Sequence, residues 1–373
     1  MEFRDLKQQY QLHKKEIDAA LGNVIKKADF IQGEQVVLLE QALAEYVGVK
    51  HCITCANGTD ALQLALMAWN IRKGDAVFVP DFTFFSSGEV VPVTGATPVF
   101  VDIEEDTYNI SPESLERAIQ YVVKETDFVP KAVIAVDLFG QPADFERIRQ
   151  VADRYNLLVL EDAAQGFGGK TGGKKACSFG DISTTSFFPA KPLGCYGDGG
   201  AVFTDNDEWA KLLRSYRVHG KGKDKYDNVR IGMNSRLDTL QAAVLLEKIK
   251  FFDDEIVACN RIAGEYSKLL NGFVKVPCIK EGMYSSWAQY TVCLQDAETR
   301  ERVINGLKEE KIPTAIYYRK PMHRQEAFKQ YIGAGLDYGN TEKICGCCLS
   351  LPMHPYMESG DVKRIADQII QIQ

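Results

Sequence analysis

The chain lacks the features by which several classes of protein are recognised. No apolar run approaches the roughly 18–20 residues that cross a membrane, and residues 1–15 are polar and charged, without the apolar stretch of a secretory signal. Lysine and arginine together number 44 against 51 aspartates and glutamates, so the net charge is −7. We therefore expect neither a membrane protein nor a nucleic-acid binder. A local phosphate site remains open, because a helix N-terminus and one or two cations suffice for it.

The ten cysteines form neither a disulfide framework nor a complete metal-binding motif. They are scattered along the chain, which favours reduced thiols and a cytoplasmic protein. Cys345, Cys347 and Cys348 lie close together, but no second CxxC and no CxxxH lies near them in the sequence, and His354 is poorly spaced to join them. We therefore predict ordinary thiols and no metal site.

Short apolar runs alternate with helical patterns through the first two thirds of the 373 residues. Residues 76–80, 98–101, 132–138 and 157–160 are nearly continuous apolar runs, typical of strands covered on both faces. Helical patterns occupy 113–119 and 144–155. The alternation predicts an α/β protein with a mostly parallel sheet wrapped by helices.

After about residue 250 the pattern changes. We expect a long helix at 255–270, a strand at 287–294, a helix at 298–311 and a final helix at 360–372. This mixture predicts a smaller α+β domain at residues 251–373, beside a large domain at residues 1–250 that includes the N-terminal segment.

Asn57-Gly58-Thr59 precedes a helical pattern with apolar residues at 62, 65, 66 and 69. Asn57 is a favourable N-cap residue. Gly58 and Thr59 would then offer backbone N–H groups and a hydroxyl at the positive end of the helix dipole, where a phosphate binds well. The alternative is a capped helix after a turn with no ligand.

The segment Glu161-Asp162-Ala163-Ala164-Gln165 directly follows the apolar run at 157–160. In an open parallel sheet, ligands lie beyond the carboxyl ends of the strands, so Asp162 is expected in that crevice. A carboxylate there suits a protonated pyridine nitrogen, and Gln165, one helical turn further on, suits the ring hydroxyl. The alternative is an acid that caps the next helix.

Lys191 lies between two prolines in an apolar loop flanked by glycines. Partial burial lowers the pKa of a lysine, and the neutral amine is the form that makes a Schiff base. Ser186 precedes it by five residues and can add a hydroxyl to a phosphate site. A lone lysine is otherwise structural or solvated.

These segments occur together in a known family. The chain resembles the DegT/DnrJ/StrS sugar aminotransferases, which have the type I (aspartate aminotransferase) fold of enzymes that depend on pyridoxal 5'-phosphate (PLP). The resemblance runs almost end to end. It rests on seven segments, taken in order: FRDLK at 3–7, CANGTDAL at 55–62, PDFT at 80–83, EDAAQ at 161–165, SFFPAKPLGCYGDGG at 186–200, NSRLDTLQAA at 234–243 and LPMHP at 351–355.

The resemblance implies a role for each matching residue. Lys191 would form the Schiff base with PLP and then act as the general base, and Asp162 would pair with the pyridine nitrogen. Gln165 would bond the ring hydroxyl, and Phe84 (or its rival Phe82) would cover the ring face. The cofactor phosphate would be held by Gly58, Thr59 and Ser186, with Asn234 reaching it from the other subunit of a homodimer.

The resemblance also implies ping-pong transamination. Glutamate would convert PLP to pyridoxamine 5'-phosphate (PMP), which would then aminate a ketone on a nucleotide-linked sugar. A few family members carry histidine in place of the lysine and remove an oxygen instead, so Lys191 favours transamination.

The closest resemblance is to the branch that aminates C3 of UDP-2-acetamido-2-deoxy-3-oxo-glucuronate for surface polysaccharides such as O-antigen. In that branch the residue matching Arg236 meets the sugar carboxylate, with an interface salt bridge as the alternative role. Two pocket positions depart from the usual pattern: Tyr317 replaces a histidine beside Tyr318, and Phe30 replaces a tyrosine. Other acceptors therefore stay open, namely a dTDP-3-keto or 4-keto deoxysugar or a keto-cyclitol, as does a non-catalytic sensor or regulator.

Overall fold

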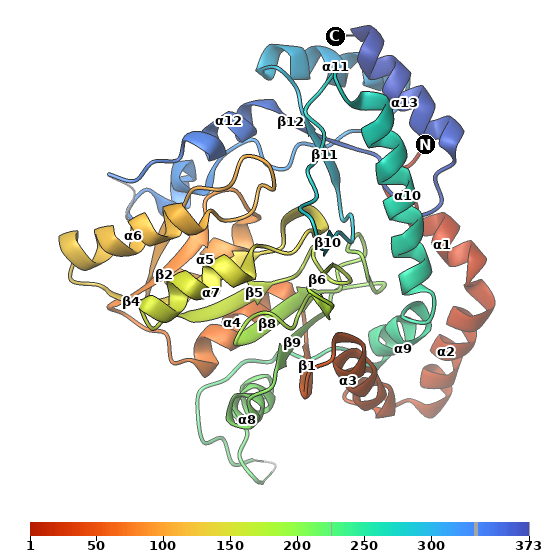
Figure 1. The fold of residues 1–373 in the computed structure, drawn as a ribbon. Coiled ribbons are helices and arrows are strands. Elements are labelled where there is room, and N and C mark those ends of the chain that lie inside the picture. Colours follow the sequence, from red (N-terminus) through yellow and green to blue (C-terminus); the bar gives the residue numbers. More distant parts are fainter. Residues whose placement is uncertain (225, 332–334, 373) are drawn as a thin grey trace.

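The computed structural model describes residues 1–224, 226–331 and 335–372. Its centre is a seven-stranded sheet (Figure 1). In spatial order the strands are β1 (His51–Cys55), β9 (Gly200–Thr204), β8 (Ile182–Ser186), β5 (Leu158–Asp162), β4 (Val129–Val136), β2 (Asp75–Pro80) and β3 (Thr97–Val101). Only β9 runs against the other strands, so the sheet is mostly parallel as the alternating pattern predicted.

Helices cover both faces of this sheet, which is why its strands are apolar throughout. One face packs on α4 (Gly58–Ala68), α5 (Phe85–Val93) and α8 (Asp207–Tyr216), and the other on α6 (Pro112–Glu125) and α7 (Phe145–Arg154). Successive residues of β2 alternate accordingly: Val77 and Val79 enter the first core cluster, whereas Ala76 and Phe78 enter the cluster beneath α6 and α7.

The N-terminal helices lie beside the β1 end of the sheet, where Figure 1 shows them in red. Helix α3 (Glu34–Val47) packs on β1 and on α9 (Thr239–Lys248), and α2 (Lys14–Lys27) also packs on α9. Helix α1 (Leu6–Leu12) leads into α2, with Asp5 accepting a hydrogen bond from the Gln8 N–H as its N-cap.

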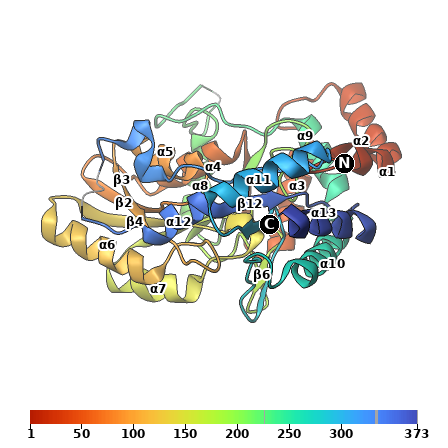
Figure 2. The same cartoon turned by 90° about the horizontal axis from the view of Figure 1, so that it is seen from above.

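The C-terminal third builds a second core. A two-stranded antiparallel sheet of β11 (Tyr290–Cys293) and β12 (Cys348–Leu351) packs with α10 (Phe252–Leu270), α11 (Ala297–Glu309) and α13 (Ser359–Ile372). Viewed from above, α11 and α13 lie over β12 (Figure 2). The start of α10 still packs with the sheet, since Phe252 and Ile256 join the α3 cluster and the second core begins at Cys259. The domain boundary at residue 250 therefore stays a prediction.

The remaining elements are short. Helix α12 (Gly339–Cys347) packs back on the first core cluster. Three small strands, β10 (Met283–Tyr284), β6 (Lys170–Thr171) and β7 (Lys174–Lys175), form a separate sheet. Single 3₁₀ turns occur at Leu138–Gly140, Met322–Arg324 and Glu326–Phe328. Within the described part of the chain, no helix is both long and apolar enough to cross a membrane.

Several strand boundaries differ from the expected ones, and side-chain hydrogen bonds account for two of them. β4 ends at Val136 rather than 138, because the next carboxylate, Asp137, turns the chain by accepting a hydrogen bond from the Ala143 N–H at 2.9 Å. β11 starts at Tyr290 rather than 287, since Trp287 has a left-handed backbone with φ 51° while its indole N–H donates to Asn260 Oδ1 at 2.9 Å. In both cases the apolar run in the sequence is longer than the strand, because a side-chain hydrogen bond takes the chain out of the extended conformation.

Ile134 tests the core between the sheet and α4. It is fully buried in the middle of β4. We expect Ile134→Ala to lower the free energy of unfolding by about 2–5 kcal/mol, because it leaves a cavity that the neighbouring strands cannot fill. Val129→Ala, at the exposed start of the same strand, should change it by less than about 0.5 kcal/mol. Denaturant unfolding checks both, and equal effects would contradict this account of the core.

Candidate active site

The carboxyl ends of the parallel strands converge on one cavity of about 640 Å³. The chain runs from β2 outward to β3 and then returns to β4 on the other side of β2, so the strand order reverses between β2 and β4. Ligands of open α/β sheets bind at such a reversal. Nine of the residues that the sequence singled out line the cavity: Gly58, Thr59, Phe84, Asp162, Gln165, Ser186, Lys191, Tyr317 and Tyr318.

Lys191 reaches this cavity from the loop between β8 and β9. The Lys191 N–H donates to the Phe188 carbonyl at 2.8 Å, which closes a tight turn. Burial lowers the pKa of the Lys191 ammonium below its usual value. The negative charge of Asp162 opposes this shift, and the positive charge of Arg4 adds to it. The neutral amine of Lys191 is therefore more accessible than that of a solvated lysine.

Asp162 is the last residue of β5 and is almost completely buried. Its Oδ2 accepts a hydrogen bond from the Ser87 hydroxyl at 2.8 Å, and its Oδ1 accepts one from the Ala164 N–H at 3.2 Å. Burial raises the pKa of the carboxyl, whereas these two donors and the charge of Lys191 act against the rise. A cationic ligand beside Asp162 would therefore stabilise its ionised form.

The N-terminus of α4 forms a narrow cradle beside Ser186. Asn57 caps the helix by accepting a hydrogen bond from the Asp60 N–H at 2.8 Å, as its residue type predicted. A Cβ on Gly58 would lie 2.7 Å from the Cβ of Ser186, so only glycine fits there. The Thr59 and Ser86 hydroxyls are 2.7 Å apart. Backbone N–H groups and three hydroxyls thus surround a space suited to an anion.

Gln165 and Tyr318 are bonded to each other across the cavity. Gln165 Nε2 donates to the Tyr318 hydroxyl at 3.1 Å, and its Oε1 accepts from the Phe139 N–H at 2.7 Å. Burial raises the pKa of Tyr318 well above its usual value, so the phenol is neutral. The second Nε2 hydrogen of Gln165 is left for another acceptor.

The two candidate phenylalanines occupy different environments. Phe84 lines the cavity with a side chain that is 54% exposed, and its ring lies 6.4 Å from that of Tyr318. Phe82 is buried in the core, where its ring contacts those of Tyr108, Phe139 and Tyr318. Only Phe84 is therefore placed to cover a ligand in this cavity.

Three sequence-predicted residues lie outside the cavity of the single chain. Asn234 and Phe30 are exposed, and Arg236 is half-buried. Their two segments adjoin, since the Thr239 N–H donates to the Phe30 carbonyl at 2.9 Å and Ile31 bridges Asp238. Arg236 has no hydrogen bond or ion pair with the residues that the structure describes.

The comparisons with known proteins agree with this geometry. A family model for the DegT/DnrJ/EryC1/StrS aminotransferases matches residues 11–370. The UDP-2-acetamido-2-deoxy-3-oxo-D-glucuronate aminotransferase of Pseudomonas aeruginosa is 44% identical over 366 residues, which cover 98% of each chain. The chain belongs to the DegT/DnrJ/EryC1/StrS aminotransferase family.

Solved structures confirm the predicted type I fold. A family member from Brucella abortus is 49% identical with a TM-score of 0.96, over 99% of this chain and 98% of that one. NtdA from Bacillus subtilis, solved with bound cofactor PMP, is 30% identical with a TM-score of 0.86, over 96% of this chain and 82% of its own.

Sequence reasoning missed the hydroxyls that follow β2. Ser87 bonds Asp162, and Thr83 and Ser86 also line the cavity. The available signal was a pair of serines in the first turn of a mostly apolar helix, shortly after a strand end. Since serine and threonine are common in such turns as caps, that signal by itself does not identify a site.

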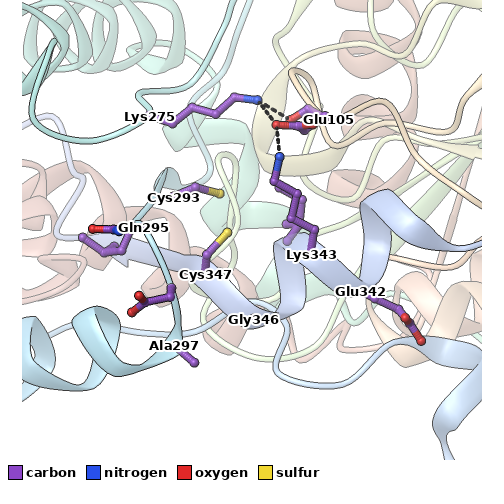
Figure 3. A pocket seen from close by; sticks show the side chains of 12 residues that line it. Glu105, Lys275, Cys293, Gln295, Ala297, Glu342, Lys343, Gly346 and Cys347 are labelled. Atoms are coloured by element: carbon purple, nitrogen blue, oxygen red, sulfur yellow. Dashed lines mark hydrogen bonds and ion pairs between the residues drawn. The ribbon is translucent and has the colours of Figure 1, made fainter.

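A second cavity of about 340 Å³ lies between β11 and α12. Figure 3 shows Cys293 and Cys347 pointing toward one another there, beside ion pairs that join Glu105 to Lys275 and Lys343. All ten cysteines are free thiols. The described residues contain no group of three or more His, Cys, Asp or Glu side chains arranged to hold a metal ion.

The charge state of Lys191 is testable without any cofactor. Only the neutral amine undergoes reductive methylation, so the pH at half-maximal reaction of Lys191 should lie below the usual lysine value of about 10.4. Asp162→Asn removes the charge that favours the ammonium, so the profile should move to lower pH.

Mass spectrometry of the Lys191 peptide measures both profiles. Asp153→Asn, on the exposed face of α7, should leave the profile where it is. An unchanged or raised midpoint in Asp162→Asn would contradict the electrostatic attraction between the two groups.

Proposed function

We propose that this protein is a PLP-dependent transaminase that moves an amino group from glutamate to the 3-keto group of UDP-2-acetamido-2-deoxy-3-oxo-glucuronate. One observation carries the proposal: a lysine with a lowered pKa and a buried carboxylate face the same cavity beside a capped helix N-terminus. PLP has three groups that need such partners: an aldehyde, a pyridine nitrogen and a phosphate.

The residues present fit this cofactor. The cradle at Gly58, which a Cβ would fill, suits the phosphate together with Thr59 and Ser186. Asp162, with burial raising its pKa, gains stabilisation from a protonated ring nitrogen. The free N–H of Gln165 is available to the ring hydroxyl, and Phe84 to the ring face. When bound, PLP supplies an electron sink that stabilises the carbanion of the amino donor or of the amine product.

The chain's own groups perform the proton steps. The neutral Nζ of Lys191 would accept the proton from the carbon of the amino donor and deliver it to the cofactor, a role that a pKa below the usual lysine value favours. Asp162 would keep the ring nitrogen protonated. Tyr318 and Gln165 fix one another by their hydrogen bond, so both keep their orientation while the substrate changes.

A second subunit would complete the site. Asn234 is exposed, and apolar residues nearby on the same segment are exposed too: Val229 at 54% and Ile231 at 89%. Exposed aliphatic side chains of this kind favour burial against another chain. We infer a homodimer in which this segment carries Asn234 to the phosphate site of the partner.

Arg236 supports an acidic sugar. It has no carboxylate partner among the described residues, and a guanidinium pairs bidentately with a substrate carboxylate. The relative from Pseudomonas aeruginosa is named for the same uronate. Phe30, on the adjoining loop, and Tyr317 would line the sugar and nucleotide pocket. The product would serve surface-polysaccharide synthesis in the cytoplasm, where ten unpaired thiols remain reduced.

The alternative acceptor is an uncharged deoxysugar on dTDP or a keto-cyclitol. Tyr317 favours it, because it replaces the histidine that the uronate branch usually carries. A purely regulatory role is disfavoured by the presence of Lys191, Asp162 and the phosphate cradle together.

The cofactor is tested by absorbance. Wild-type protein with PLP should show the visible band of lysine-bound PLP, and glutamate should bleach it as PMP forms. Lys191→Ala should lack the band because it lacks the amine. Lys7→Ala, an exposed lysine paired with Glu2, should keep it. Wild-type protein that stays colourless with excess PLP would overturn the proposal.

The acceptor is tested with two UDP-3-keto sugars that differ only at C6, one with a carboxylate and one with a hydroxymethyl group. The PMP form should aminate the uronate faster, and Arg236→Gln should remove most of that preference. Loss of one charge-assisted pair corresponds to roughly a tenfold or larger fall in kcat/KM. Turnover of a dTDP-deoxysugar without turnover of the uronate would favour the alternative.

A further inference from the structure

The FRDLK segment at 3–7 has no part in the function described so far, yet it contacts the lysine loop. Arg4 Nη2 donates hydrogen bonds to the backbone carbonyls of Lys191 at 3.0 Å and of Pro192 at 3.3 Å. The two partners are separated from Arg4 in sequence by more than 180 residues, so tertiary structure brings them together. The guanidinium thus holds the backbone of Lys191 itself.

The lysine loop needs donors from outside. Pro189 and Pro192 flank the lysine and have no N–H, so the loop cannot form a continuous hydrogen-bond ladder of its own. Lys248 supplies a second external donor, since its buried Nζ bonds the Gly194 carbonyl at 2.7 Å from α9. Two cations therefore hold the loop, one from the N-terminal segment and one from α9.

The same segment contacts the other side of the site. The Phe3 ring lies 6.5 Å from that of Tyr317, and the Phe3 carbonyl accepts from the Met353 N–H at 3.2 Å. Asp5 is committed to capping α1. The segment therefore joins the lysine loop, the Tyr317 loop and the chain that leaves β12.

We propose that Arg4 is a positioning residue for Lys191, tethering its backbone so that the amine stays aimed into the cavity when it has no covalent partner. This inference rests on the proposed function, in which Lys191 must be released from the cofactor and still transfer protons. Proton transfer depends steeply on the distance and orientation of the donor and acceptor, so a loosened loop lowers the rate.

The charge of Arg4 adds a second effect. Together with burial it lowers the pKa of Lys191, which favours the neutral amine. A lysine at position 4 would keep this charge and reach one carbonyl, whereas alanine would remove both contributions.

The experiment compares Arg4→Ala and Arg4→Lys with Lys7→Ala, which changes an exposed lysine of the same segment. Hydrogen exchange of peptides from 186–200 in the cofactor-free protein reports on the loop alone. Pre-steady-state bleaching of PLP-loaded protein by glutamate reports on proton transfer, with the maximal rate and the half-saturating glutamate concentration determined separately.

Arg4→Ala should speed exchange in 186–200 while peptides of β4 and β5 stay as in the wild type. Its maximal bleaching rate should fall about tenfold or more, because two charge-assisted hydrogen bonds to the loop are lost. The half-saturating glutamate concentration should stay within about twofold of the wild-type value. Arg4→Lys should recover part of the rate, and Lys7→Ala should match the wild type.

If Arg4→Ala showed the same hydrogen exchange and the same bleaching rate as the wild type, the proposed tether would be wrong. Faster exchange throughout the chain without rescue by Arg4→Lys would also overturn it, since that result indicates general destabilisation. The exchange measurement needs no cofactor, so a colourless wild-type protein would refute the proposed transamination, whereas an unchanged loop in Arg4→Ala would refute the tether alone.

Discussion

Lys191 and Asp162 face one cavity from which burial excludes much of the water, and burial disfavours the charged form of each. Their mutual attraction offsets part of that cost. The other features of the site hold these two groups in place. Ser87 and the Ala164 N–H donate hydrogen bonds to the carboxylate of Asp162, and a loop bounded by prolines positions Lys191. A cofactor with a cationic nitrogen and an aldehyde would lower the cost of burying both groups, because the nitrogen would pair with the carboxylate and the aldehyde would react with the amine.

Parallel topology explains how distant segments supply this pair. Asp162 ends β5, Ser186 ends β8 and Ser87 follows β2, and all three strands present their carboxyl ends to one side of the sheet. The cradle at Gly58 comes from the N-terminus of α4, on the same side. Rigid strands thus set the distances, while loops such as those at Phe30 and Tyr317 supply residues that can differ between relatives with different sugars.

Much of this could be predicted from sequence because local patterns determine it. The four apolar runs became strands, and Asn57 capped α4, since periodicity and capping depend on near neighbours in the chain. Ser87 and Arg4 could not be found in that way, because their importance lies in partners 75 or more residues away. The end of β4 was misplaced for a different reason: the apolar run continues to Leu138, although Asp137 ends the strand by accepting a hydrogen bond from the nearby Ala143 N–H. The place proposed for Asn234 depends on a second subunit, whose contacts local patterns within one chain do not determine.

The identity of the reacting lysine is the central claim, and one measurement addresses it directly. Protein loaded with PLP is reduced with borohydride, digested and analysed by mass spectrometry, which locates the stable adduct on a single peptide. The account predicts that the adduct lies on Lys191, in the peptide that contains Pro189 and Pro192. An adduct on any other lysine, or none at all, would contradict it.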